Sequence, residues 1–340
     1  MTRTVEMYKC LQQSPQIYRL LMHYLHLVTI PLYSVSIYVL VSKTTKVLKN
    51  YKNYLLWHIL GNIVFEVYIS LLMLPMTYLP FPVFRSTGIL MHFDLNGLLA
   101  FYALMYLIMH IFISILEMFR YRYNVAIDKT SKSYSMVRNL YKVNYGFCIL
   151  SPIIAGCALP SCLSHQLLYK NQLFDKYNDA VPIEIMCNTT VIAPPFSDTV
   201  MILTLIIIVI LCILGGIIIT TTTRGILKKL DEMRSNMSAR TVALQRMLLI
   251  SLVVQGLVHC IMLIIPIATF LYAIVYVLTN DVIAYIGILV ISFHGPFSTI
   301  AMIIFTKPVQ DGIKGLFRPI VERRSTIQLS AVAISWNKSM

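Results

Sequence analysis

The sequence predicts an all-α integral membrane protein built as a bundle of seven transmembrane helices. Of its 340 residues, 58% are hydrophobic and only 12% are charged, and the mean hydropathy is +0.74. Soluble domains carry about 25% charged residues, so the composition excludes an ordinary soluble domain. Seven apolar runs are each long enough to cross a hydrocarbon core of roughly 30 Å as a helix.

The seven runs divide the chain into an N-terminal segment (1–17), a seven-span domain (18–306) and a tail (307–340). The N-terminal segment is polar, and the first run is too long for the apolar region of a cleavable signal, so we interpret it as the first transmembrane helix. We expect spans over residues 18–41, 54–76, 89–116, 143–163, 199–223, 247–273 and 282–306.

Lysine and arginine gather in alternate connections between the spans. The connections 42–53, 117–142 and 224–246, together with the tail 307–340, hold 22 of the 28 basic residues. Cytoplasmic loops retain basic residues, so this asymmetry predicts an N-terminus outside and a cytoplasmic C-terminus. The net charge of +14 therefore reflects membrane topology. We expect the lipid bilayer, and no nucleic acid, as the partner of these charges.

The predicted outer side carries two candidate modification sites. Asn188 opens a glycosylation sequon in the outer loop 164–198. Cys10 and Cys187 are the only cysteines clearly outside the spans, and both face the oxidising side. We therefore expect a disulfide between them, with Cys162 as the competing partner. The remaining cysteines are scattered singly, so neither a metal site nor a cofactor is expected.

Polar side chains within the spans are candidates for function, because a charge at the bilayer centre costs at least about 2.5–3.5 kcal/mol. Glu66 lies midway along the second span, one turn after Asn62. His294 lies midway along the seventh span, one turn before Ser298. Glu66 and His294 fall at nearly equal depth, which predicts a hydrogen bond between them. This intramembrane polar network is either structural or part of a moving switch.

The outer end of the third span carries candidate ligand-binding residues. His92, Asp94 and Asn96 occupy its first two turns, within reach of a cavity open to the outside. Four aromatic residues are candidates for the walls of this cavity: Tyr102, Phe270, Tyr272 and Tyr285. Ligand pockets combine apolar walls with a few polar anchors, which suits this set. A helix cap or a pairing with another helix is the alternative role for Asp94.

The inner end of the third span carries candidate coupling residues, namely Glu117, Arg120 and Arg122. Glu117 and Arg120 are three residues apart, so they meet on one side of the helix. Such a pair can hold the helix end closed and release an arginine to a partner. The alternative is a basic flank whose side chains reach the lipid headgroups.

The segment 308–321 predicts a short amphipathic helix on the inner membrane face, with an irregular basic tail as the alternative. Lys314 and Arg318 are available for lipid headgroups. Five apolar residues recur at helical spacing: Val309, Ile313, Leu316, Phe317 and Ile320.

Enzyme classes find no support in the sequence. HExxH, GxSxG and glycine-rich phosphate-binding patterns do not occur, and the loops are too short for a catalytic domain. His58, His110 and His259 are expected to be single and unclustered, which favours packing roles over metal binding.

Three local patterns resemble the nematode serpentine chemoreceptors, most closely the Srh-type class and its Sri-type relatives, over about residues 10–319. The first is Ser42-Lys43-Thr44 leading into Lys52-Asn53-Tyr54-Leu55-Leu56. The second is Leu74-Pro75 followed by Leu79-Pro80 and Gly88. The third and most specific is His294-Gly295 with Ser298-Thr299, and then Lys307-Pro308. The chain departs from the class at Thr45, where proline is usual, and at Val309-Gln310, where tyrosine and arginine are common.

The resemblance implies a G-protein-coupled receptor in the plasma or ciliary membrane of sensory neurons. Such a receptor senses a small chemical and activates a heterotrimeric G protein. The Asp-Arg-Tyr and Asn-Pro-x-x-Tyr patterns of rhodopsin-like receptors are absent, so Glu117 and Arg120 are analogues of activation residues by position only.

Two alternatives belong to other functional classes. A ligand-gated channel or transporter is favoured if Asp94, Glu66 and Glu117 line a continuous polar path. The odd number of spans and the lack of an internal repeat argue against the common transporter designs. A non-signalling scaffold would need no pocket.

The charge asymmetry makes a topological prediction. An epitope at the N-terminus should be stained on intact cells, and an epitope after Met340 only after permeabilisation, because basic connections stay in the cytoplasm. Immunofluorescence of cells expressing the two tagged chains measures this. Staining of the C-terminal epitope on intact cells would reverse the orientation.

Overall fold

The computed structural model describes residues 14–42, 49–93, 96–177, 181–186, 189–192, 199–235 and 238–316, and it confirms the predicted seven-helix bundle. Five spans are continuous α-helices: α1 (Gln16–Ser42), α3 (Gly97–Ala126), α4 (Lys132–Ser164), α6 (Thr199–Glu232) and α9 (Asp281–Phe305). The second span joins α2 (Lys52–Val67) to the π-helical η2 (Tyr68–Met73). The sixth joins α7 (Ala239–His259), the π-helical η7 (Cys260–Ile264) and α8 (Ile265–Val275).

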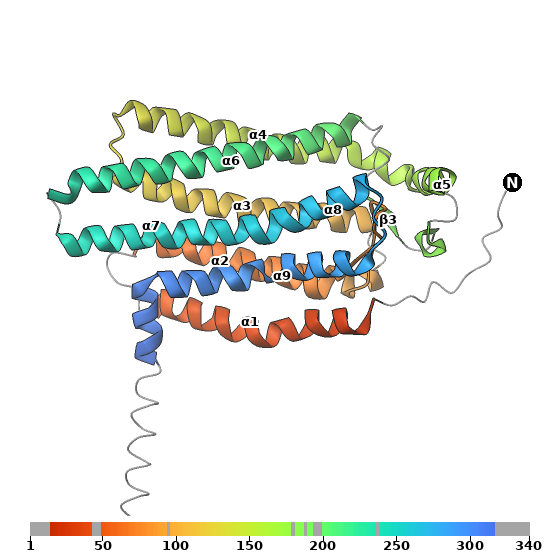
Figure 1. The fold of residues 1–340 in the computed structure, drawn as a ribbon, viewed down its shortest axis with the longest axis horizontal. Helices are drawn as coiled ribbons and strands as arrows, with labels where there is room; N and C mark the ends of the chain where they lie inside the picture. Colours follow the sequence, from red (N-terminus) through yellow and green to blue (C-terminus); the bar gives the residue numbers. More distant parts are fainter. Residues whose placement is uncertain are drawn as a thin grey trace, which may run out of the picture.

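The two ends of the bundle differ in character (Figure 1). One end, called the sheet end below, carries short strands and the helix α5 (Gln166–Tyr177). The opposite end, called the basic end, carries the connections from α3 to α4 and from α6 to α7. The helix α1 begins at the sheet end and α9 ends at the basic end, as an odd number of spans requires.

Four helices extend past the predicted spans at the basic end. The helix α3 ends at Ala126, α4 begins at Lys132, α6 ends at Glu232 and α7 begins at Ala239. Apolar windows detect only the part of a helix inside the hydrocarbon. Lys, Arg, Glu and Leu are good helix formers that continue the same helix into water. The segments expected as long cytoplasmic connections are therefore mostly helical.

The third span begins eight residues later than predicted, at Gly97 instead of residue 89. Residues Ile89–Phe93 form the short 3₁₀ helix η3, and His92 lies in it. Asn96 is the N-cap of α3, because its side chain accepts a hydrogen bond of 2.9 Å from the Leu98 N–H. The prediction that His92 and Asn96 occupy the first turns of this span is wrong, since both precede the helix.

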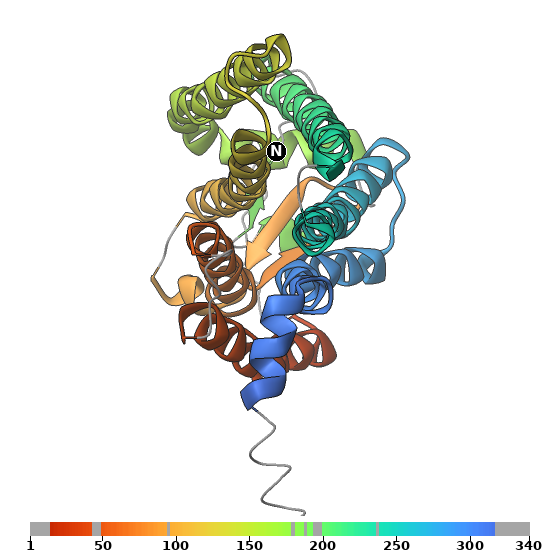
Figure 2. The ribbon, with the colours of Figure 1, turned by 90° about the vertical axis from the view of Figure 1, so that its left-hand side faces the viewer.

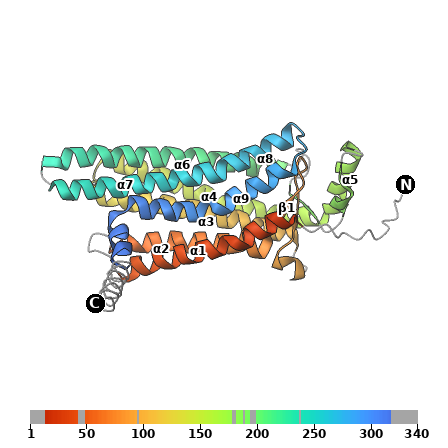
Figure 3. The same ribbon diagram turned by 60° about the horizontal axis from the view of Figure 1, so that its bottom comes forward.

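A small antiparallel sheet closes the sheet end, and the all-helical prediction missed it. Its strands are β1 (Pro75–Thr77), β2 (Val83–Ser86) and β3 (Thr190–Val191), in the order β1-β2-β3. Gln166 ties α5 to this sheet, because its side chain accepts from the Val191 N–H at 2.8 Å and donates to the Val191 carbonyl at 3.2 Å. The helix α5 stands beyond the sheet (Figure 3).

The helix α3 lies between α2, α6 and α7, while α9 packs against α1, α2 and α7. Figure 2 shows this arrangement from the basic end, with the strands of the sheet visible between the helices. Phe65, Phe119 and Tyr123 are among the largest fully buried side chains. Large apolar side chains such as Ile17 and Val28 are 74% and 70% exposed on the outside of the bundle. This distribution suits a bundle whose outer surface meets lipid.

Two glycines of the family-like patterns are required by close approach. A Cβ atom at Gly88 would lie 2.5 Å from the Leu72 carbonyl oxygen. A Cβ atom at Gly295 would lie 2.6 Å from the Tyr33 hydroxyl and 2.9 Å from the Asn62 Cβ. Gly295 therefore lets α9 approach α1 and α2 more closely than any other residue would.

After α9, residues 307–316 form a helix that turns away from the α9 axis (Figures 1 and 3). Val309 is buried and Ile313 is half-buried, whereas Asp311 and Lys314 are exposed. The predicted amphipathic segment is therefore helical as far as Leu316. Phe317, Arg318 and Ile320 lie outside the described residues, and the location of this helix on the membrane stays a prediction.

Candidate functional site

A cavity of about 350 Å³ opens at the sheet end, between the sheet and the first turns of α1 and α9. Eight residues line it: Pro15, Met76, Thr77, Tyr78, Pro182, Glu184, Asp281 and Tyr285. Ligand pockets occupy about 300–1,000 Å³, so this cavity suits a small molecule. Buried apolar residues of the sheet and of the 164–192 segment, including Phe81, Leu173 and Ile185, form the cluster that supports it.

The cavity combines acceptors, donors and an aromatic wall. Glu184 and Asp281 contribute carboxylates. Burial raises the pKa of the Tyr78 hydroxyl, an effect that the neighbouring Arg85 opposes, so this hydroxyl stays protonated and can donate. The Tyr285 ring lies 5.0 Å from the Tyr18 ring, and the Tyr18 hydroxyl donates to the Pro75 carbonyl at 2.9 Å. These contacts fix Tyr285 against α1 and the sheet.

Of the predicted ligand-binding residues, only Tyr285 lines this cavity. His92 is exposed on η3, and Asn96 is occupied as a helix cap. Tyr102 is half-buried on α3. Phe270 packs with Leu79, Ala273 and Ala284. Asp94 lies outside the described residues, as do Cys10, Cys187 and Asn188.

Sequence reasoning missed three polar residues of the cavity, Tyr78, Glu184 and Asp281. Asp281 follows the helix cap Asn280 directly, and this cap is a recognisable start signal for the seventh span. Tyr78 and Glu184 belong to connections without periodicity, so no local signal placed them near α9.

Midway along the bundle, Glu66 bonds to α1. The Thr29 hydroxyl donates to its Oε1, and the Tyr33 hydroxyl donates to its Oε2 at 3.0 Å. The His26 ring lies between Glu66 and Ser70, with N–O distances of 3.2 and 2.8 Å. Only 2% of Glu66 is exposed, so these partners replace the water that a carboxylate would otherwise bind. The predicted hydrogen bond from Glu66 to His294 is therefore wrong, because nearer hydroxyls on α1 satisfy the carboxylate.

His58 connects three helices in the core. Its Nδ1 lies 2.7 Å from the Ser114 hydroxyl, which donates to the Ile111 carbonyl, so the imidazole N–H donates to Ser114. The His58 Nε2 then accepts from the Asn62 amide at 3.3 Å and from the Ser298 hydroxyl at 3.4 Å. His58 thereby joins α2 to α3 and α9.

His259 and His294 complete a row of three histidines with His58. The His259 ring lies 5.0 Å from the His58 ring and 5.1 Å from the His294 ring. The prediction that His58 and His259 are unclustered is therefore wrong, because separate spans bring them together. The Nδ1 atom of each of the three histidines bonds to a hydroxyl or to a backbone carbonyl. No group of His, Cys, Asp or Glu in the described part of the chain is arranged to hold a metal ion.

On α7, the polar core residues bond mainly to their own helix. The His259 Nδ1–H donates to the Gln255 carbonyl at 2.8 Å, and the Gln255 amide donates to the Ser251 hydroxyl and carbonyl at 3.1 and 3.2 Å. Within the core α7 meets its neighbours through ring contacts. Nearer the basic end, Ser251 forms a 2.9 Å hydrogen bond with Thr306.

At the basic end, Glu117 is the centre of a three-residue cluster. It accepts from the Arg120 Nε and Nη2 atoms at 2.9 and 2.5 Å, so the i,i+3 spacing produces an ion pair. The Tyr145 hydroxyl of α4 donates to the second carboxylate oxygen. This second bond links α3 to α4, a contact that sequence spacing alone does not predict.

Arg122 points away from Glu117 and toward two other helices. Its Nη1 donates to the Gln245 side chain of α7 at 3.1 Å. Its guanidinium lies 3.9 Å from the centre of the Tyr51 ring, next to α2. Arg122 is only 7% exposed, so it is a buried connector between α3 and α7 rather than a side chain that reaches the lipid headgroups.

The family model for the serpentine type 7TM GPCR chemoreceptor Srh matches residues 13–319 of this sequence. The chain belongs to this family. It is therefore a multi-pass membrane protein of the G-protein-coupled receptor class with a chemoreceptor role, and the family is not one of enzymes. Comparison with curated proteins and with solved structures finds no match.

The match agrees with the Srh-type resemblance of the three sequence patterns. In the receptor, residues of the most specific pattern meet α2. Ser298 bonds to His58, and His294 lies edge-on to Phe65 at 4.7 Å. Gly295 allows this approach.

The receptor should depend strongly on Glu66 for stability. Replacing Glu66 with alanine leaves the Thr29 and Tyr33 hydroxyls without their acceptor, and each unpartnered buried group costs about 1–3 kcal/mol. We expect a loss of about 2–5 kcal/mol, measured as the thermal unfolding midpoint of the purified receptor. Glu232→Ala is the control, since 51% of that side chain is exposed. Equal midpoints for the two variants would contradict the proposed role of Glu66.

Proposed function

We propose that the receptor binds a small chemical ligand in the sheet-end cavity and activates a heterotrimeric G protein at the basic end. The single observation that supports this most directly is the position of α3. This helix begins below the sheet, touches α2, α6 and α7, and carries the Glu117 and Arg122 contacts toward its basic end. The proposal places the sheet end outside and the basic end in the cytoplasm, in the plasma or ciliary membrane of sensory neurons.

The cavity is the proposed ligand site because its walls belong to elements that a ligand could draw together. Tyr78 lies between β1 and β2, Glu184 lies in the 3₁₀ helix Ile183–Met186, and Asp281 opens α9. A ligand bridging these groups would favour one arrangement of the sheet relative to α9. A ligand shifts a conformational equilibrium only through such differential affinity.

At the basic end, α7 is the proposed moving helix. Among the described residues, Gln245 accepts from Arg122, Ser251 bonds to Thr306, and the Arg246 guanidinium donates to Asp231 of α6 at the exposed surface. The Met247 sulfur accepts from the Lys307 N–H. In the core, its polar groups bond to α7 itself, so a displacement of α7 breaks few bonds between helices. We infer that G-protein binding competes for the Arg122–Gln245 contact and for the exposed Arg120.

The channel or transporter alternative required a polar path through Asp94, Glu66 and Glu117. Glu66 faces α1, whereas Glu117 faces Arg120 and α4. These two acids belong to separate clusters, so among the described residues no observation favours this alternative.

Ligand recognition is tested at the two cavity carboxylates. In cells expressing the receptor, a panel of volatile and soluble chemicals should yield a G-protein signal without a ligand-evoked current. For an active compound, Asp281→Asn or Glu184→Gln should raise the half-maximal concentration roughly 10- to 100-fold, because hydrogen bonds to charged groups contribute about 1.5–3 kcal/mol.

The matched control for these variants is Asp175→Asn, an exposed acid on α5 at the same end of the receptor that does not line the cavity. Surface expression should be equal for all three variants. Unchanged potency in both cavity variants would place the ligand site elsewhere, and an evoked current would favour the channel.

The Glu117 cluster should restrain the resting receptor. Glu117→Gln removes the ionic part of its bonds to Arg120, about 1 kcal/mol, and should raise ligand-free G-protein activation about fivefold.

Arg120→Ala should lower the maximal response with little change in ligand affinity, because this arginine is proposed to contact the G protein. Glu232→Gln, on an exposed ion pair with Lys229, is the control. A Glu117→Gln receptor that merely loses surface expression would show a structural role instead.

A further inference from the structure

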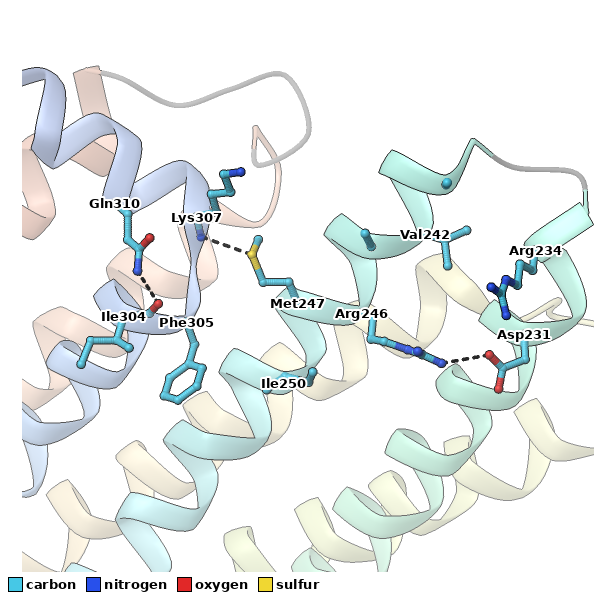
Figure 4. A pocket seen from close by; sticks show the side chains of 12 residues that line it. Asp231, Arg234, Val242, Arg246, Met247, Ile250, Ile304, Phe305, Lys307 and Gln310 are labelled. Carbon is cyan, nitrogen blue, oxygen red and sulfur yellow. Dashed lines mark hydrogen bonds and ion pairs between the residues drawn. The ribbon is translucent and has the colours of Figure 1, made fainter.

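A groove of about 890 Å³ runs across the outside of α7 at the basic end (Figure 4). Its walls come from the end of α6, from α7, and from the segment that joins α9 to the following helix. Within α7, the groove contacts Val242, Arg246 and Ile250. Leu248 and Leu252 of the same helix are buried and point into the bundle. The groove therefore opens away from the centre of the bundle.

The rim of the groove is positively charged. Arg234, Arg246 and Lys307 line it together with a single acid, Asp231. The Arg246 guanidinium is paired with Asp231 at 3.0 Å. Arg234 and Lys307 form no ion pair within the part of the chain that the structure describes. Figure 4 shows the side chains of Lys307 and Arg234 on opposite walls of the groove. An anionic molecule in the groove would therefore have a basic side chain at each wall.

The floor of the groove is apolar. Ile250 is 45% exposed, Ile304 is 54% exposed and Phe305 is 38% exposed. All three belong to helices that cross the membrane, whereas Lys307 follows the last of these helices directly and Arg234 follows the part of α6 that continues past its predicted span. The groove thus passes from charged residues toward the basic end to apolar residues nearer the middle of the bundle.

We propose that this groove binds an anionic phospholipid of the inner leaflet. The lipid phosphates lie between Arg234 and Lys307, and the acyl chains cover Ile250, Ile304 and Phe305. The proposal rests on the cytoplasmic orientation of the basic end given under the proposed function. Basic grooves between membrane helices on this side recognise phosphoinositide headgroups by charge, whereas a neutral lipid offers no net negative charge to two basic residues without ionic partners among the described residues. A bound lipid would connect α6, α7 and the 307–316 helix.

The experiment measures lipid binding without ligand or G protein. The purified full-length receptor is titrated with nanodiscs of phosphatidylcholine that contain a fluorescent phosphatidylinositol bisphosphate, and energy transfer from the receptor reports binding. Arg234→Gln with Lys307→Gln should weaken binding roughly 10- to 30-fold, because each basic residue near anionic lipid contributes about fivefold. Arg240→Gln with Lys132→Gln removes the same charge at the same end of the receptor but outside the groove, and should leave binding unchanged.

Three results would overturn the proposal. Equal loss in both double variants would show that only overall charge attracts the lipid. Full competition by the water-soluble inositol phosphate headgroup at matched concentration would show that the apolar floor contributes nothing. Unchanged lipid binding in the groove variant would show that Arg234 and Lys307 do not hold the lipid phosphates. Because binding is measured without signalling, its failure leaves the proposed receptor function untouched.

Discussion

A polar group inside a bilayer has no water to bond, and this constraint accounts for how the helices of the receptor are joined. Among the described residues, several strongly polar side chains in the middle of spans form hydrogen bonds across helices or with their own backbone. Glu66 joins α2 to α1 through hydroxyl groups, and His58 joins α2 to α3 and α9. The apolar surfaces of these helices are as compatible with lipid as with one another. The polar pairs therefore select which helices become neighbours.

The need to satisfy polar groups without water also distinguishes helices that are tied to their neighbours from a helix that is free to move. His58 bonds to other helices, whereas Gln255 and His259 satisfy their donors within α7. A helix whose core donors are satisfied internally can change neighbours at lower cost. The buried connector Arg122 is then decisive, because it holds α7 to α3 at the end where a cytoplasmic partner would bind. The π-helical segment η7 adds a local departure from α-helical geometry between the two halves of this span.

The bundle was predictable from the sequence because hydropathy depends only on local composition, and seven spans follow from it directly. The Glu117–Arg120 pair was predictable for a similar reason, since both residues lie on one turn. The partners of Glu66 could not be predicted, because Thr29 and Tyr33 are neutral residues more than thirty positions away that carry no distinctive sequence signal. The strands β1 to β3 are two to four residues long, which is too short to show an alternating pattern. Their pairing depends on a loop that is distant in sequence.

Gly295 has a consequence for how the receptor can move. With no side chain there, α9 approaches Tyr33 of α1 and Asn62 of α2, and the Glu66 and Ser298 bonds lie within one turn of the contact. A close contact of this kind cannot rotate or slide without a collision, because its atoms already lie at the minimum separation. The helices α1, α2 and α9 thus form a stationary wall. In the proposed mechanism, the displacement that carries a signal across the membrane therefore belongs to the opposite half, with α6 and α7.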